Sequence, residues 1–495
     1  MGCGQYELPA EIRLLILEAL LQNGCSVAPF AVVSREWQAV IEPHNFGRIH
    51  LTPSRLTDVD TILRRNRALV GYIWFCIELE SYDCATCASA NVDDWGLSET
   101  DNTIIMTALQ SLFSTLSAWP PNGNLLLDIS VYSPSDSIHW FKYLTCSPDN
   151  PSDKYNRNRR PDQVERVEVD DHQRIWNANN RDCAPHKNEN AIEKVFDEIM
   201  CAGPFSTEEE EWQWFRQLPA VPAVTGLLLR QQTRRRWKPL SLLEMLARFP
   251  ELQEIQYEPW REWNNWQQRH TDGYYRALFE SLASTNLRRL VLFENFNQYY
   301  PQSFHNCEPL RTPDLWCSEW IANVSLKLDH LSASFIADAS YFFDARKSSW
   351  EWPNLTSLVL TSQLLTPDKN PSDIDRLLRA AAAAAMKMPK LEIMEIWNGR
   401  EGLAALFRYR STGGGHPPVL TWKGTWALTL QPPLVQLWES VASKYCGSRS
   451  IVVVHELLCN DNIGSHGDAL HILEPLNTVI RPVSLQQIQI EHQFR

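Results

Sequence analysis

The apolar positions at the start of the chain follow a helical period. In residues 6–50 they recur at intervals of three and four, which places them on one side of a helix. This stripe consists of Ile12, Leu15, Ile16, Ala19 and Leu20. Similar spacing predicts a second short helix beginning near Pro29 and a third from about Arg35 to Ile41, ended by Pro43. The pattern therefore predicts a unit of three helices.

Three helices in about forty residues bury too little surface to be comfortably stable alone. This segment is nevertheless rich in large apolar side chains. Part of that apolar surface must therefore face something outside the unit.

The wording of the segment resembles the F-box. The residues that carry the resemblance are Leu8-Pro9-x-Glu11-Ile12, Ile16-Leu17, Leu20, Val32-Val33-Ser34-Arg35-x-Trp37 and Ile41. In that family the module docks on a Skp-type adaptor, which joins it to a cullin, a RING subunit and a ubiquitin-conjugating enzyme. The resemblance, which extends to the large group of fungal F-box proteins, implies a non-catalytic substrate receptor of an SCF-type ubiquitin ligase.

The resemblance also implies which side chains face the adaptor. These residues are Leu8, Pro9, Ile12, Ile16, Leu20, Pro29, Val32, Val33 and Trp37. The alternative is that the same nine residues form the core of a three-helix cap on the next domain. The stretch Cys25–Ala28 departs from the usual family wording, which leaves the local contact open.

Beyond residue 50 a second pattern recurs: apolar-x-x-apolar-x-apolar, whose last two positions share one face of a strand. It fits Val70/Ile73/Phe75, Leu126/Ile129/Val131, Val164/Val167/Val169, Val224/Leu227/Leu229, Leu252/Ile255/Tyr257, Leu287/Leu290/Leu292, Ile321/Val324/Leu326, Leu355/Leu358/Leu360, Leu391/Met394/Ile396 and Leu485/Ile488/Ile490. Between Val224 and Leu391 the matches are 28, 35, 34, 34 and 36 residues apart. Helix-period stretches lie between several of them, including the alanine run 380–385.

A unit of one strand and one helix cannot cover its own apolar side, so neighbouring units must stack. We therefore predict an α/β solenoid over residues 51–495, with parallel strands lining its concave face and helices on the other. It resembles irregular leucine-rich repeats, although only Asn295 occupies the position of that family's asparagine ladder. Loop insertions are expected near 76–125, 145–163 and 170–223.

The composition restricts the function further. The 46 Lys and Arg against 59 Asp and Glu give a formal charge of −13, which disfavours nucleic acids and anionic membranes as partners. No apolar run is long enough to cross a bilayer. The 12 cysteines show no disulfide framework, so we expect reduced thiols in the cytoplasm or nucleus. The charge runs Glu208–Glu211 and Arg234–Lys238 are interpreted as solvated edges, with partner contacts or nuclear import as alternatives.

Motifs for chemistry are sparse. Cys84-x-x-Cys87 lacks a second ligand pair for zinc, and His466, Asp468 and His471 do not have the spacing of a metalloprotease helix. No catalytic serine elbow, phosphate-binding loop or dinucleotide fingerprint is present. We expect no catalytic, cofactor or metal residues, and a solenoid enzyme ranks last among the hypotheses.

Two surfaces are candidates for binding a protein client. The first is the run of Trp260, Arg261, Trp263 and Trp266, whose indoles would share one side of a helical turn and act as interface anchors, or simply pack at a repeat edge. The second is the concave strand face, represented by Glu254, Gln256, Arg289, Asn323, Ser357 and Glu395. A broad concave surface favours a protein over a small molecule. The runner-up function is a cullin-independent F-box scaffold in assembly or trafficking.

Overall fold

The structure is a computed structural model. It describes residues 9–22, 27–83, 85–91, 94–121, 123–138, 141, 144–149, 189–200, 203–304, 307–411, 416–448 and 450–492. The predicted adaptor contact Leu8, the cysteine Cys84, the strand match Val164/Val167/Val169 and most of the loop 145–163 lie outside the described residues.

The body of the molecule is a sheet of 12 strands whose spatial order follows the order of the chain. Its strands are β1 (Arg48–Leu51), β2 (Tyr72–Glu78), β3 (Leu125–Tyr132), β5 (Val224–Leu229), β7 (Glu254–Tyr257), β8 (Arg289–Phe293), β9 (His330–Asp338), β10 (Ser357–Thr361), β11 (Ile393–Arg400), β12 (Leu403–Arg410), β13 (Val419–Gly424) and β14 (Val452–Leu457). Neighbouring strands are parallel from β1 to β11 and again between β13 and β14, whereas β12 runs antiparallel to both its neighbours. The fold is therefore mixed α/β with a mostly parallel sheet, as predicted at that level. A small second sheet pairs β4 (Glu198–Ile199) with β6 (Arg236–Trp237).

Helices connect the strands. The α-helices are α1 (Ala10–Gln22), α2 (Arg35–Phe46), α3 (Pro53–Leu63), α4 (Glu99–Ser117), α6 (Glu189–Phe196), α7 (Glu208–Gln217), α8 (Pro239–Leu246), α9 (Asn265–Leu282), α10 (Leu315–Ser325), α11 (Ala339–Asp344), α12 (Pro371–Ala385), α13 (Pro432–Cys446), α14 (His466–Leu473) and α15 (Pro482–Glu491). The 3-10 turns are η1 (Ala28–Val32), η2 (Arg67–Leu69), η4 (Pro134–Ser137), η6 (Gln231–Thr233) and η7 (Tyr300–Ser303).

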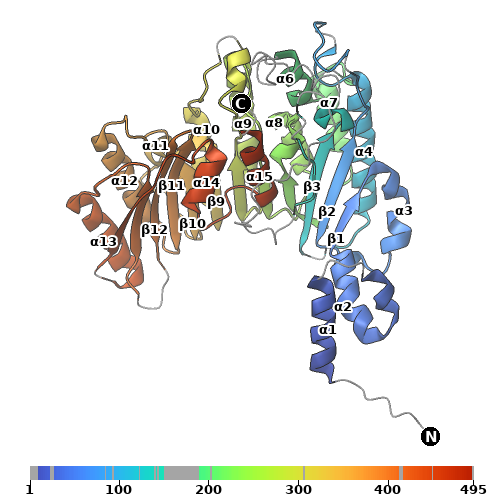
Figure 1. Ribbon diagram of the computed structural model, residues 1–495, viewed down its shortest axis with the longest axis horizontal. Helices are drawn as coiled ribbons and strands as arrows, with labels where there is room; N and C mark the ends of the chain where they lie inside the picture. Colours follow the sequence, from blue (N-terminus) through green and yellow to red (C-terminus); the bar gives the residue numbers. More distant parts are fainter. Residues whose placement is uncertain are drawn as a thin grey trace.

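The main hydrophobic core lies between one face of the sheet and the layer of helices from α3 to α13 (Figure 1). In β8, Leu290 and Leu292 point into this core, while Phe293 packs in a second core on the opposite face. The strands β5 and β10 are buried along almost their whole length. Because both of their faces are covered, their sequences are nearly continuous apolar runs. The buried alanines of α12 belong to this core, where their small side chains allow close packing.

Most of the repeated matches are strands, but two are not. Ile321/Val324/Leu326 lies in or directly after α10, and the strand of that unit is β9, which begins at His330. Leu485/Ile488/Ile490 lies in α15. The reason is geometric: positions three apart also share one face of a helix, so the pattern does not separate the two structures. Asn323 is therefore a residue of the helical layer and not of the strand face, which corrects its assignment as a client contact.

Other local predictions are also corrected. The helix α2 continues through Pro43 to Phe46, with the Gly47 N–H bonded to the Pro43 carbonyl at 2.8 Å. The stretches expected to be loop insertions contain regular elements, namely α4 within 76–125 and α6, β4 and α7 within 170–223.

The C-terminal segment, residues 459–492, covers the face of the sheet opposite the helical layer, called the inner face below. Figure 1 shows α14 and α15, in red, lying against this face. Side chains such as Leu470 and Ile488 pack against Phe293, Val359 and Trp397 from three strands. Apolar burial of this kind makes the segment part of the core.

Polar groups on the inner face are also satisfied by this segment. The buried carboxylate of Glu258 accepts hydrogen bonds from the Arg481 N–H at 2.9 Å and the Ser484 hydroxyl at 2.5 Å. Glu395, also buried, accepts from the Leu476 N–H at 3.2 Å and pairs with Arg408. A buried charge needs such partners because desolvation is otherwise strongly unfavourable.

The basic run at 234–238 is not a solvated edge, so that interpretation was wrong. Arg234 and Arg235 are buried, and each pairs with a carboxylate from a distant part of the chain. The pairs made by this run are Arg234–Glu491 at 3.0 Å, Arg235–Asp136 at 2.7 Å, Arg236–Glu262 at 2.6 Å and Lys238–Glu211 at 3.3 Å. Because Glu211 belongs to the acidic run, the two runs meet in the folded chain.

We predict that Glu491→Gln lowers the free energy of unfolding by about 3 kcal/mol, because it leaves the buried Arg234 guanidinium without its counter-charge. Glu491 also accepts a hydrogen bond from buried Tyr300. The matched control is Glu401→Gln, whose carboxylate accepts from the hydroxyl of the neighbouring Tyr299 at the surface. The control should change stability by less than about 0.5 kcal/mol. Chemical denaturation measures both, and equal effects would contradict the role of the C-terminal segment.

Candidate functional sites: an N-terminal apolar surface and a pocket at the carboxyl edge

The helix α1 is apolar on nearly every side. Among its large apolar residues with described side chains, Leu17 alone is buried, while Leu14 and Leu15 are exposed, Leu15 by 59%. A helix of this composition is normally covered all round. Helix α1 therefore presents apolar surface that the described part of the chain leaves in contact with water.

The three N-terminal helices have a small core of their own. Leu17, Val27 and Ile41 are buried in it, and Leu20 and Trp37 pack against it. Ser34 caps α2 by accepting a hydrogen bond from the Trp37 N–H at 3.2 Å. The helices are thus held together from within, and Figure 1 shows α1 and α2 extending away from the sheet beside β1.

The exposed apolar side chains continue from α1 onto η1. Val32 is 88% exposed and Val33 is 61% exposed, an unusual state for valines that follow one another. We call the set the N-terminal apolar surface; it consists of Ile12, Leu14, Leu15, Ile16, Phe30, Val32 and Val33. Apolar residues concentrated in this way typically mark an interaction site.

The predicted adaptor contacts divide into two groups. The exposed ones are Pro9, Ile12, Ile16, Pro29, Val32 and Val33. Leu20 and Trp37 are partly buried and contribute to the small core instead. The alternative, in which these residues form the core of a cap on the next domain, does not fit the six exposed residues, because core residues would be buried.

The concave strand face is not available as a client surface in this structure, because the C-terminal segment covers much of it. Gln256, Ser357 and Glu395 are buried. Glu254 and Arg289 are half-buried and pair with each other at 3.2 Å.

The tryptophans do not form one exposed row, so the predicted helical turn was wrong. Trp260 and Trp263 precede α9 in an extended loop and are buried beside Phe196 and Tyr300, with ring centroids 4.9 to 6.3 Å apart. Trp266 lies in the first turn of α9 and is 63% exposed. Arg261 is buried, and its guanidinium donates to the carbonyls of Glu308 and Pro309.

A pocket of about 260 Å³ lies at the carboxyl ends of the central strands. Loops that follow β7, β8 and β10 build it together with the end of β11, and Phe335 of the bulged strand β9 lies in its wall. Its lining consists of Arg261, Glu294, Phe296, Glu308, Leu310, Arg311, Thr312, Phe335, Gln363, Thr366, Asp368, Lys369, Asn398, Gly399 and Arg400. We call it the carboxyl-edge pocket.

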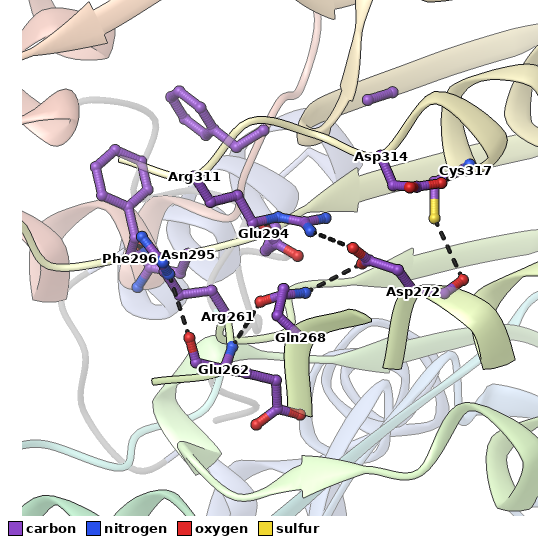
Figure 2. A network of polar contacts seen from close by, with 12 residues as sticks. Arg261, Glu262, Gln268, Asp272, Glu294, Asn295, Phe296, Arg311, Asp314 and Cys317 are labelled. Carbon is purple, nitrogen blue, oxygen red and sulfur yellow. Dashed lines mark hydrogen bonds and ion pairs between the residues drawn. The ribbon is translucent and has the colours of Figure 1, made fainter. Parts of the chain in front are cut away.

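A buried polar network forms the wall of this pocket beside β8 (Figure 2). The Arg311 guanidinium binds two carboxylates, Asp272 at 2.6 Å and Glu294 at 2.5 Å. Asp272 also accepts from the Gln268 amide at 3.1 Å, and the other end of Gln268 accepts from the Glu262 N–H at 2.9 Å. The network therefore ties the pocket to the N-terminal half of α9.

Glu294 titrates unusually within this network. Burial raises the pKa of the Glu294 carboxyl to about 7; the nearby charge of Asp272 adds to the increase, and that of Arg311 opposes it. Burial decides the direction, because desolvation disfavours the charged carboxylate more than the Arg311 guanidinium stabilises it.

Sequence reasoning missed the residues of the carboxyl-edge pocket apart from Arg261. Arg311 lies in a loop without periodicity, and Phe335 lies in a strand that the pattern placed at residues 321–326, whereas β9 begins at His330. His466 was noted only as a metal ligand candidate. It is instead fully buried, with its Nε2 2.8 Å from the Asn295 side-chain oxygen and its ring stacked on Phe296. The only sequence feature that pointed to this contact was Asn295, which occupies the position of the asparagine ladder.

Comparisons with known proteins provide little further information. Residues 281–481 match the model of a family of unknown function, DUF6546, which is less than half of the chain. The match extends from the end of α9 to the start of α15 and includes most of the pocket. No curated protein and no solved structure matches the chain. Within the described residues, no helix is long and apolar enough to cross a membrane.

The raised pKa of Glu294 predicts a pH dependence of stability. Between the ordinary value of 4.5 and about 7, the folded state holds a proton on Glu294 that the unfolded state has lost. The contribution of Glu294 to stability therefore falls as the pH rises through this interval. Relative to wild type, Glu294→Gln should gain up to about 3 kcal/mol between pH 4.5 and pH 7. Chemical denaturation at a series of pH values measures the difference.

The control for this experiment is Glu308→Gln, which neutralises an exposed carboxylate of the same pocket. Its stability curve should run parallel to that of wild type. A Glu294→Gln curve that is also parallel to wild type would contradict the raised pKa.

Proposed function

We propose that the chain is a non-catalytic substrate receptor of an SCF-type ubiquitin ligase, with residues 6–50 as its F-box and the remainder as its client-binding body. The observation that carries the proposal is the N-terminal apolar surface, which combines the F-box wording of the sequence with large apolar side chains left in water. In the same proposal the body is an irregular leucine-rich-repeat-like solenoid, which the chain-ordered parallel strands support.

The energetics favour an obligate protein partner for this surface. Burying one large aliphatic side chain contributes about 1.5 to 3 kcal/mol. Six aliphatic side chains and Phe30 are exposed on α1 and in residues 30–33, so a partner that covers most of them gains enough to offset the cost of association. The small internal core keeps the helices preformed, which lowers the ordering cost of binding.

The arrangement of the chain also suits a receptor. The N-terminal helices lead directly into β1 at its amino end, whereas the carboxyl-edge pocket lies where the parallel strands terminate. An adaptor bound to the helices would leave the opposite edge of the sheet accessible (Figure 1). A receptor needs no catalytic groups, because it accelerates transfer by holding a client lysine near the charged conjugating enzyme.

Co-purification with a Skp-type adaptor tests the proposal. We expect the full chain to form a stable complex, and the double variant Ile16→Glu/Val32→Glu to bind at least about 100-fold more weakly, because two carboxylates would be desolvated in the interface. Both side chains are exposed, so the variant should keep the thermal stability of wild type.

The matched control is Val454→Glu/Leu457→Glu on the edge strand β14, where the two side chains are exposed by 41% and 71%. This variant carries the same change in charge and should retain the adaptor. If the wild-type chain, shown to be folded, fails to bind the adaptor, the proposal is wrong.

Adding the cullin separates the receptor from the scaffold. A complex that contains both adaptor and cullin supports the receptor, whereas a complex that excludes cullin supports the alternative of a cullin-independent F-box scaffold. Either result is read from the same purified complex by size-exclusion chromatography.

A further inference from the structure

The carboxyl-edge pocket lies where open parallel sheets bind their ligands. Loops after several parallel strands converge there and leave a cavity of about 260 Å³, close to the lower end of the range of about 300 to 1,000 Å³ for ligand sites. In sheets of this kind, ligands bind outside the carboxyl ends of the strands.

A strained residue shapes the pocket. β9 pairs with β10 through Ala333 and again through Asp338, so four residues between them are displaced from the ladder. Within this bulge Phe335 has a φ of +62°, in the left-handed region that a phenylalanine rarely adopts. Its N–H donates to the Thr361 hydroxyl at 2.7 Å, which holds the strained backbone. Strain of this kind clusters at ligand sites.

The bulge places an aromatic surface in the pocket. The rings of Phe335 and Phe296 meet edge to face with centroids 4.9 Å apart. Trp397 packs behind Phe335 at 5.0 Å, and His466 stacks on Phe296 at 4.3 Å. These contacts fix both rings, so the pocket offers a rigid apolar surface to a flat ligand group.

The charged groups around this surface are of two kinds. The buried carboxylate Glu294 is paired with Arg311. On the side of β10 and β11, Lys369 is exposed and Arg400 is half-buried, and the positive charges of both act on the exposed carboxylate of Asp368. Glu308 and Asp368 are exposed carboxylates of the same lining. An anion close to Lys369 and Arg400 would thus meet two cations beside the aromatic rings, where an exposed carboxylate, Asp368, is the neighbouring opposite charge.

We propose that the carboxyl-edge pocket binds a carboxylate attached to a flat apolar group, with the apolar group against Phe296 and Phe335 and the carboxylate between Lys369 and Arg400. This chemistry is shared by a free aromatic acid and by a C-terminal phenylalanine of a polypeptide. In the second case the pocket is the client site, and that reading alone rests on the function proposed above.

Calorimetric titration of the full chain with N-acetyl-L-phenylalanine and with its uncharged amide tests the proposal. The acid should bind at least about tenfold more tightly than the amide, because only the acid pairs with the cations. A peptide that ends in phenylalanine distinguishes the sources: tighter binding than the single residue supports a polypeptide ligand, and exclusion of the peptide supports a small acid. No binding of the acid, or equal binding of acid and amide, would overturn the proposal.

Variants of charged residues in the pocket lining locate the site. Lys369→Gln/Arg400→Gln should weaken binding of the acid about tenfold, whereas Glu308→Gln should tighten it about two- to threefold, because it removes a like charge. The matched control is Arg376→Gln/Lys390→Gln, which removes two cations that the pocket lining does not include. The proposal fails if the first pair and its control weaken binding equally. The pocket contains no residue of 6–50, so the result of these binding measurements does not depend on whether the chain binds the adaptor.

Discussion

The packing of the C-terminal segment against the inner face is the interaction on which the rest of the structure depends. A parallel sheet with helices on one side leaves its other face uncovered. Here that face carries buried ionic side chains such as Glu258 and Glu395, together with aromatic rings. The segment 459–492 supplies the partners of both kinds. Without it, the charges would be buried unpaired or the apolar groups would meet water.

This closure moves the accessible sites to the margins of the sheet. The broad strand face that a horseshoe would offer to a client is largely occupied by the chain itself. The N-terminal apolar surface beside β1 and the carboxyl-edge pocket at the ends of the central strands both remain accessible. The N-terminal apolar surface lies near the amino ends of the parallel strands, and the pocket lies at their carboxyl ends. A protein built in this way can hold one partner at each end without competition between them.

Long-range pairing also explains why the basic run was misinterpreted. Basic residues in a run are usually solvated, and an isolated sequence cannot show that four carboxylates from other parts of the chain will reach them. In the folded chain, Asp136, Glu211, Glu262 and Glu491 do so. The tryptophans were misread for a related reason. Their spacing of three is helical, but Trp260 and Trp263 lie in a loop whose path is set by the aromatic cluster around Phe196.

Periodicity in the amino-acid sequence was enough to predict the class of fold and many of its helices and strands. The period of Ile12 to Leu20 predicted a helix, and the spacing of Val224 to Leu391 predicted parallel strands alternating with helices, because burial on one face leaves a period in the chain. It also predicted excess apolar surface near the N-terminus. The contacts of the inner face, the burial of the arginines and the position of the pocket follow from tertiary packing alone. Those features join residues far apart in the sequence, by 253 positions in the pair Gln231 and Ser484, and no local period records such contacts.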